Sequence, residues 1–170
     1  MLDEMTMRVA IRTTARISFA VFLGAFLGNA LYRLVPVAPT RWLMANKDGF
    51  VLGFAVSHTV HLAFILTLVV AIGREHALKG TMVVAFTTGL LFIYALAARV
   101  LFRPLPLSSS RFEALAHWYL MALFAVSFTR HAVIRPLFYT PFVLVAITAL
   151  GLRIAAAIRS KKAQVLGVNA

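Results

Sequence analysis

Histidines are the residues of this sequence whose type and spacing suggest chemistry. The stretch 112–131, FEALAHWYLMALFAVSFTRH, carries His117 near one end and His131 at the other. At about 100° and about 1.5 Å per residue, these imidazoles lie about 40° apart around a helix and about 21 Å apart along it. The upstream stretch SHTVHLAF carries His58 and His61. Since an iron held between two helices can take one neutral imidazole from each, the pattern predicts a haem b in a membrane protein that moves electrons.

The expected axial pair is His61 and His131. If the second span starts near Met44, both histidines lie about 17 to 19 residues into spans that cross the membrane in the same direction. His58, one turn earlier on the same face, is the alternative ligand or a hydrogen-bond partner of a haem propionate. Arg130 either pairs with a propionate or extends its charge to the membrane interface.

His117 has no obvious partner for a second haem. Two haems would lie one in each leaflet, so the partner of His117 would be about 14 residues upstream of His61. That position is Lys47, which cannot bind iron while protonated. The sequence therefore favours one haem over two. Together with Trp118 and Tyr119, His117 either contacts a quinone or a partner's flavin, or belongs to an interfacial aromatic cluster.

Long apolar helices must position these histidines. The 170 residues are 62% hydrophobic and include only five acids, whereas soluble domains are about 45–50% apolar. We therefore expect a single all-α domain over 1–170, which is a polytopic membrane bundle of about five transmembrane helices. Within it, residues 1–16 form an interfacial lead-in to the first span. No soluble flavin or nicotinamide domain is expected. The expected spans are 17–35, 46–72, 81–102, 112–131 and 137–158.

The net charge of +12 comes from 17 basic residues that lie between the apolar runs. This distribution indicates contacts with lipid headgroups of the bilayer, and not with nucleic acid. Ten basic residues fall on one side of the predicted bundle and seven on the other. The excess predicts a bacterial inner-membrane protein with its N-terminus outside and its C-terminus in the cytoplasm. The absence of cysteine excludes disulfides, iron–sulfur clusters and thiolate ligands.

Four segments between about Arg41 and Ile158 carry a family resemblance: DGFVLGFAVSHTVHLAF, ALAARVLF, HWYLMALFAVSFTRH and LGLRIAA. They resemble the ferric-reductase-like transmembrane domain, a superfamily that includes NADPH oxidases, ferric reductases and the haem-binding membrane subunit of the methionine sulfoxide reductase system. By this resemblance, His61 corresponds to the outer-haem ligand of the earlier helix, and His117 and His131 to the two ligands of the later helix. The first of the usual six spans and the inner-haem ligand on span two have no counterpart here.

The resemblance implies an electron-transfer subunit of an oxidoreductase. It would take electrons from a quinol or from a separate cytoplasmic donor protein and pass them to an acceptor protein at the outer face. The alternative is a helical membrane protein without a cofactor, such as a small transporter or an assembly or scaffold subunit. In that case the histidines would form hydrogen bonds between helices.

Overall fold

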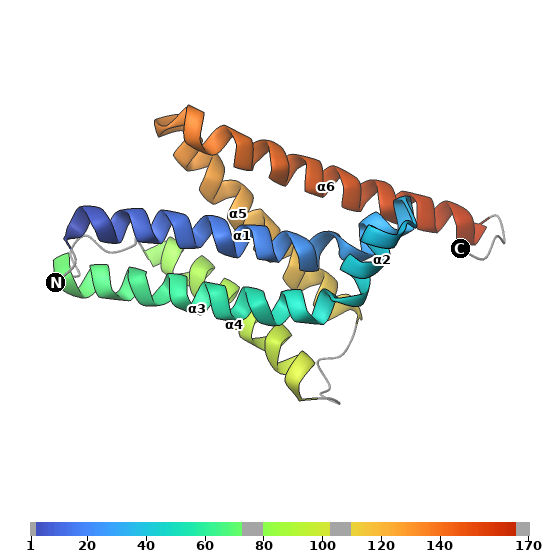
Figure 1. The fold of residues 1–170 in the computed structure, drawn as a ribbon, viewed down its shortest axis with the longest axis horizontal. Helices are drawn as coiled ribbons and strands as arrows, with labels where there is room; N and C mark the ends of the chain where they lie inside the picture. Colours follow the sequence, from blue (N-terminus) through green and yellow to red (C-terminus); the bar gives the residue numbers. More distant parts are fainter. Residues whose placement is uncertain (1–2, 73–79, 103–109, 166–170) are drawn as a thin grey trace. The chain divides into compact units, whose positions relative to one another are not determined.

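The chain is helical throughout the part that the computed structural model describes, which comprises residues 3–72, 80–102 and 110–165. These residues form six helices and no strand (Figure 1). The predicted all-α class is therefore confirmed. In chain order the helices are α1 (Glu4–Leu34), α2 (Ala38–Ala45), α3 (Lys47–Ile72), α4 (Gly80–Leu101), α5 (Ser110–Ile134) and α6 (Pro136–Val165).

Five of these helices, all except α2, are long and apolar enough to cross a membrane. Their number matches the five or so transmembrane helices expected from the sequence. Many of their large apolar side chains are exposed, including Val70 and Leu137, which are 84% and 89% exposed. Exposed apolar surface of this extent suits contact with lipid acyl chains.

Two details differ from the expected elements. Helix α1 begins at Glu4, so the basic lead-in continues into the first span as one helix. The carboxylate of Asp3 accepts a hydrogen bond of 2.6 Å from the Thr6 backbone N–H, which satisfies a donor that the first helical turn would otherwise leave open. This backbone bond, followed by the side-chain bond with Thr6, lowers the pKa of Asp3. The second difference is α2, which forms where a loop was expected.

The described contacts divide the chain into two compact units. Unit 1 comprises Met1–Phe22 and Gly49–Ala116, and unit 2 comprises Leu23–Asp48 and His117–Ala170. The division runs through α1 and α5. His58 and His61 therefore belong to unit 1, and His117, Arg130 and His131 belong to unit 2.

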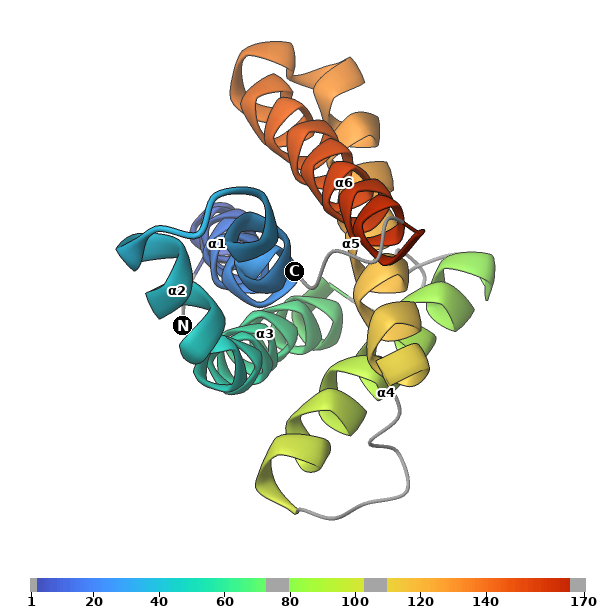
Figure 2. The same ribbon diagram turned by 90° about the vertical axis from the view of Figure 1, so that its right-hand side faces the viewer.

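In unit 1, the first part of α1 packs beside α3 (Figures 1 and 2). The rings of Phe22 and Phe54 are 5.0 Å apart between their centroids. Gly53 leaves room for α1, since a Cβ at this position would lie 3.3 Å from a methyl group of Val21. These contacts hold α1 and α3 close enough for their polar side chains to meet.

An ion pair joins α4 to α5 within unit 1. The guanidinium of Arg99, near the end of α4, contacts the carboxylate of Glu113 in the first turn of α5. The rings of Phe92 and Phe112 pack 5.9 Å apart on the same two helices. Both charged side chains are largely covered, so the pair neutralises two charges that would be costly to bury singly.

In unit 2, α2 lies against α1 at a glycine. A Cβ at Gly28 would lie 3.1 Å from the backbone oxygen of Leu43 in α2. The sequence pairs Gly28 with Gly24 in a GxxxG step, which predicts close helix packing. At Gly28, the helix that makes the close approach is the short α2.

Replacing Gly28 by Val should therefore displace α2. The added atoms meet backbone and not a movable side chain, so we expect a loss of about 1–3 kcal/mol of stability. Gly151→Val is the matched control, because a Cβ at Gly151 has nothing within 4 Å. Thermal unfolding in detergent, followed by tryptophan fluorescence, measures both variants. Equal melting temperatures for the two variants would contradict the packing of α2 on Gly28.

Candidate functional site

Two histidines of unit 1, His58 and His61, lie on α3, and His61 faces a hydroxyl group on α1. The Nδ1 atom of His61 is 3.0 Å from the Oγ1 atom of Thr14. The rings of His58 and His61 are 5.4 Å apart, and His58 also packs 5.5 Å from the ring of Phe54. The structure thus brings His58 and His61 together, as their spacing of three residues on one helix predicts.

The hydrogen bonds of Thr14 determine which nitrogen of His61 carries the proton. The Thr14 hydroxyl donates to the backbone oxygen of Ala10 at 2.8 Å, one turn earlier on α1. A hydroxyl has one proton, so its oxygen accepts the bond from His61. When the hydroxyl proton lies on the bond to Ala10, Nδ1 of His61 is the N–H donor, and Nε2 of the neutral imidazole keeps its lone pair.

Two further polar atoms are buried in the same stretch of the α1–α3 contact. They are Oγ of Ser18 and Nδ1 of His58, and neither has a hydrogen-bond partner among the described residues. Ser18 lies between Thr14 and Phe22 on α1, and His58 lies between His61 and Phe54 on α3. These atoms provide hydrogen-bonding capacity for a polar group that enters this contact.

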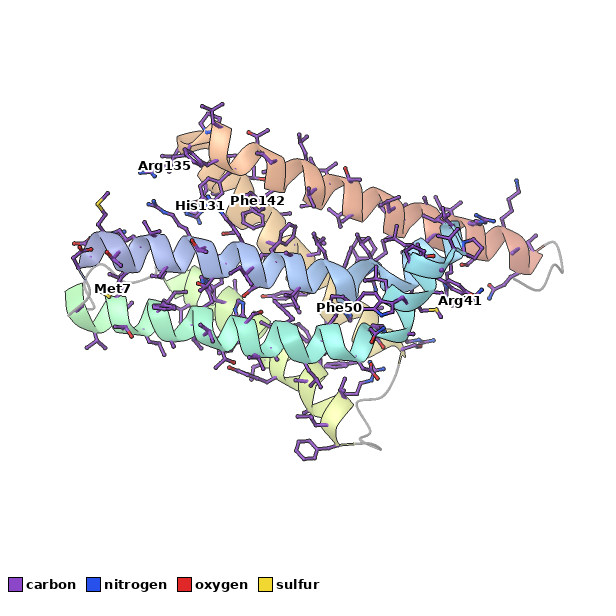
Figure 3. All side chains as sticks on the ribbon, viewed as in Figure 1. Met7, Arg41, Phe50, His131, Arg135 and Phe142 are labelled. Carbon is purple, nitrogen blue, oxygen red and sulfur yellow. The ribbon has the colours of Figure 1, made fainter. Side chains whose placement is uncertain are left out.

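In unit 2, His131 has a similar arrangement on α5. Its Nδ1 lies 2.7 Å from the backbone oxygen of Ser127, one turn earlier. A carbonyl oxygen only accepts, so Nδ1 is again the donor, and in the neutral form of the ring Nε2 keeps its lone pair. The ring packs 5.1 Å from Tyr139 of α6, and the side chain is exposed, as is that of Arg130. Figure 3 shows His131 near Phe142 and Arg135 at one end of this unit.

His117 occupies a different environment, in the packed interior of unit 2. It is only 1% exposed, and its ring lies 6.5 Å from that of Phe26 in α1. The guanidinium of Arg153 in α6 lies 4.3 Å from the Phe26 ring centroid and 5.8 Å from that of Trp118. Arg153 also donates a hydrogen bond of 2.9 Å to the Phe26 backbone oxygen. An aromatic cluster around a largely covered cation therefore surrounds His117.

The sequence alone did not single out three side chains that make polar contacts in these two units. Thr14 lies in the segment interpreted as a lead-in, and the helical spacing of Thr14 and Ser18 was the signal that could have found them. Arg153 was counted only as a charge that sets topology. The third is Tyr94 of α4, whose hydroxyl bonds the hydroxyl of Thr59 on α3 at 2.9 Å.

Within the described ranges, no group of three or more His, Asp or Glu side chains could hold a metal ion. A haem iron needs only two protein ligands, because its porphyrin supplies the others. The chemistry available at His61 and His131 is therefore ligation by single imidazoles, each through Nε2.

Comparisons with known proteins identify no relative, so the class of this chain follows from its structure alone. No family model matches it, and no curated protein or solved structure matches it either. Its five long apolar helices define an integral membrane protein of the all-α class.

The hydrogen bond to Thr14 should fix the tautomer of His61. In protein labelled with ¹⁵N-histidine, we expect His61 to carry its proton on Nδ1 alone. Thr14→Val removes the acceptor and should give a mixture of tautomers, whereas Thr14→Ser keeps the hydroxyl and should keep the Nδ1–H form. Ring ¹⁵N chemical shifts measure this without any cofactor. A wild-type His61 protonated on Nε2 would show the assignment to be wrong.

Proposed function

We propose that this chain is a membrane b-type haem protein that passes electrons across the bilayer. One observation carries the proposal: both expected axial ligands, His61 and His131, direct Nδ1 to an oxygen of their own unit. Each imidazole thus has Nε2 available with its lone pair. Haem-ligating histidines need this form, and a hydrogen bond from the other ring nitrogen fixes the ring and increases its basicity.

The pairing of His61 with His131 rests on their matched depth in the sequence. Haem b, when bound, supplies a one-electron couple at its iron. His61 and His131 would hold the iron as two neutral imidazoles, a ligand set that suits electron transfer and not oxygen binding. His58, with its buried Nδ1, and the exposed Arg130 are candidate partners of the two propionates.

The burial of His117 favours a supporting role. Its ring is enclosed by side chains of unit 2, so a planar cofactor would have to displace Phe26 or Trp118 to reach it. This agrees with one haem and not two. The ferric-reductase-like resemblance supports the same proposal, with a quinol or a flavoprotein as donor, an acceptor at the outer face, and a bacterial inner membrane with the C-terminus in the cytoplasm.

A second candidate is a helical membrane protein without a cofactor, either a small transporter or a scaffold subunit. The contact between Thr14 and His61 favours it to some degree, because hydrogen bonds of this kind join membrane helices without any ligand. The hydrogen bond of His131 to Ser127 joins no two helices. That bond therefore gives this candidate no support.

The visible spectrum of the purified, haem-supplemented protein separates the two candidates. A sharp reduced α-band is expected for bis-imidazole haem. His61→Ala and His131→Ala should each abolish this low-spin signal, since the iron loses one of two protein ligands. His117→Ala should retain it, and serves as the matched control for removing an imidazole.

A flat visible spectrum would favour the cofactor-free alternative. If His117→Ala abolishes haem binding while His131→Ala retains it, the ligand pair is His58 or His61 with His117. The depth alignment of the two helices would then be wrong by about three to four turns.

A further inference from the structure

Unit 2 carries an unbalanced positive charge. Its two segments contain nine Lys and Arg residues and a single acid, Asp48, which is the last residue of the first segment. Cations near a membrane are stabilised by carboxylates, by backbone oxygens or by lipid phosphate groups. Since carboxylates are nearly absent from this unit, backbone oxygens and lipid phosphates remain to stabilise its cations.

Two arginines link the end of α1 to the last turns of α6. Arg33 of α1 donates to the hydroxyl of Ser160 at 3.1 Å, and Arg159 of α6 donates to the backbone oxygen of Leu34 at 2.7 Å. Each of these bonds uses one nitrogen of the guanidinium, which has five N–H donors. Both side chains are exposed, so their remaining donors face outwards.

Further exposed cations lie near these two arginines in the chain. Lys161 and Lys162 follow on α6, and Arg41 lies on α2, the helix that comes directly after the end of α1. Figure 3 shows Arg41 at the opposite end of the unit from Arg135. We call this set the basic rim; it consists of Arg33, Arg41, Arg159, Lys161 and Lys162.

Exposed apolar side chains adjoin the basic rim. Ile158 precedes Arg159, Val35 follows Leu34, and both are more than half exposed. On α2, the exposed Trp42 is next to Arg41, and tryptophan favours the boundary between headgroups and acyl chains. Cations beside apolar surface match a molecule with a phosphate at one end and hydrocarbon at the other.

We infer that the basic rim binds the headgroup of an anionic phospholipid. The forked guanidinium groups of Arg33 and Arg159 suit phosphate oxygens, and the lysines add positive charge. The acyl chains lie along the apolar side chains beside the rim. A nucleic acid or a free anion would leave this apolar surface uncovered. The inference goes beyond electron transfer and does not depend on haem.

The test measures how lipids change the melting temperature of the full chain in detergent. Phosphatidylglycerol should raise it by several degrees more than phosphatidylcholine with the same acyl chains. Arg33→Gln and Arg159→Gln should each weaken the apparent affinity for phosphatidylglycerol several-fold. Arg135→Gln also removes one charge from an exposed residue of unit 2 and should leave the affinity unchanged.

A second variant covers the case in which the arginine variants fail to fold. Lys161→Gln combined with Lys162→Gln removes two cations of the rim and leaves both cross-helix hydrogen bonds in place, and it too should weaken binding. Arg12→Gln combined with Arg135→Gln removes two charges elsewhere in the chain as its control.

Three results would overturn the inference. Equal stabilisation by the two lipids would show that the site does not select an anionic headgroup. Equal losses of affinity for phosphatidylglycerol in the rim and control variants would indicate a general attraction between the positive chain and anionic lipid. Stabilisation of the same size by inorganic phosphate would indicate a site for free anions and not for lipid.

Discussion

A polar group among apolar helices has no water to bond, so it must find its partner in a neighbouring helix or in its own backbone. Three of the described side chains follow that constraint. Thr14 bonds both its own helix and His61, His131 bonds the carbonyl one turn earlier, and Arg153 bonds the carbonyl of Phe26. These bonds orient the imidazoles, and orientation is what makes one ring nitrogen available for chemistry.

The same constraint accounts for how the charges are accommodated. In unit 1, Arg99 meets the carboxylate of Glu113. Unit 2 has almost no acids, and there Arg153 and Arg159 bond backbone oxygens of α1 instead. A carbonyl oxygen carries only a partial charge, so it neutralises an arginine incompletely. Such a unit is suited to lipids whose phosphates supply the missing negative charge.

These two features fit a single picture of a small membrane electron carrier. In the proposed function, imidazoles would hold the cofactor through Nε2, and an anionic lipid at the basic rim would stabilise the contact between the end of α1 and the last turns of α6. The buried cluster of Phe26, Trp118 and Arg153 gives His117 a packing role. Its burial distinguishes it from the exposed His131 on the same helix, although both histidines were equal candidates by residue type.

By itself, the sequence determined the all-α class of the protein and the number of its long apolar helices. Apolar runs long enough to span a bilayer form helices in any packing arrangement, because every backbone group must bond within its own segment. The shared face of His58 and His61 likewise follows from helical geometry alone. Only the tertiary structure decided what depends on neighbouring helices: Thr14 as the partner of His61, the burial of His117, the contact of Arg153 with Phe26 and the packing of α2 on Gly28. Each of these joins residues distant in the sequence, and local periodicity carries no information about which faces of two helices meet.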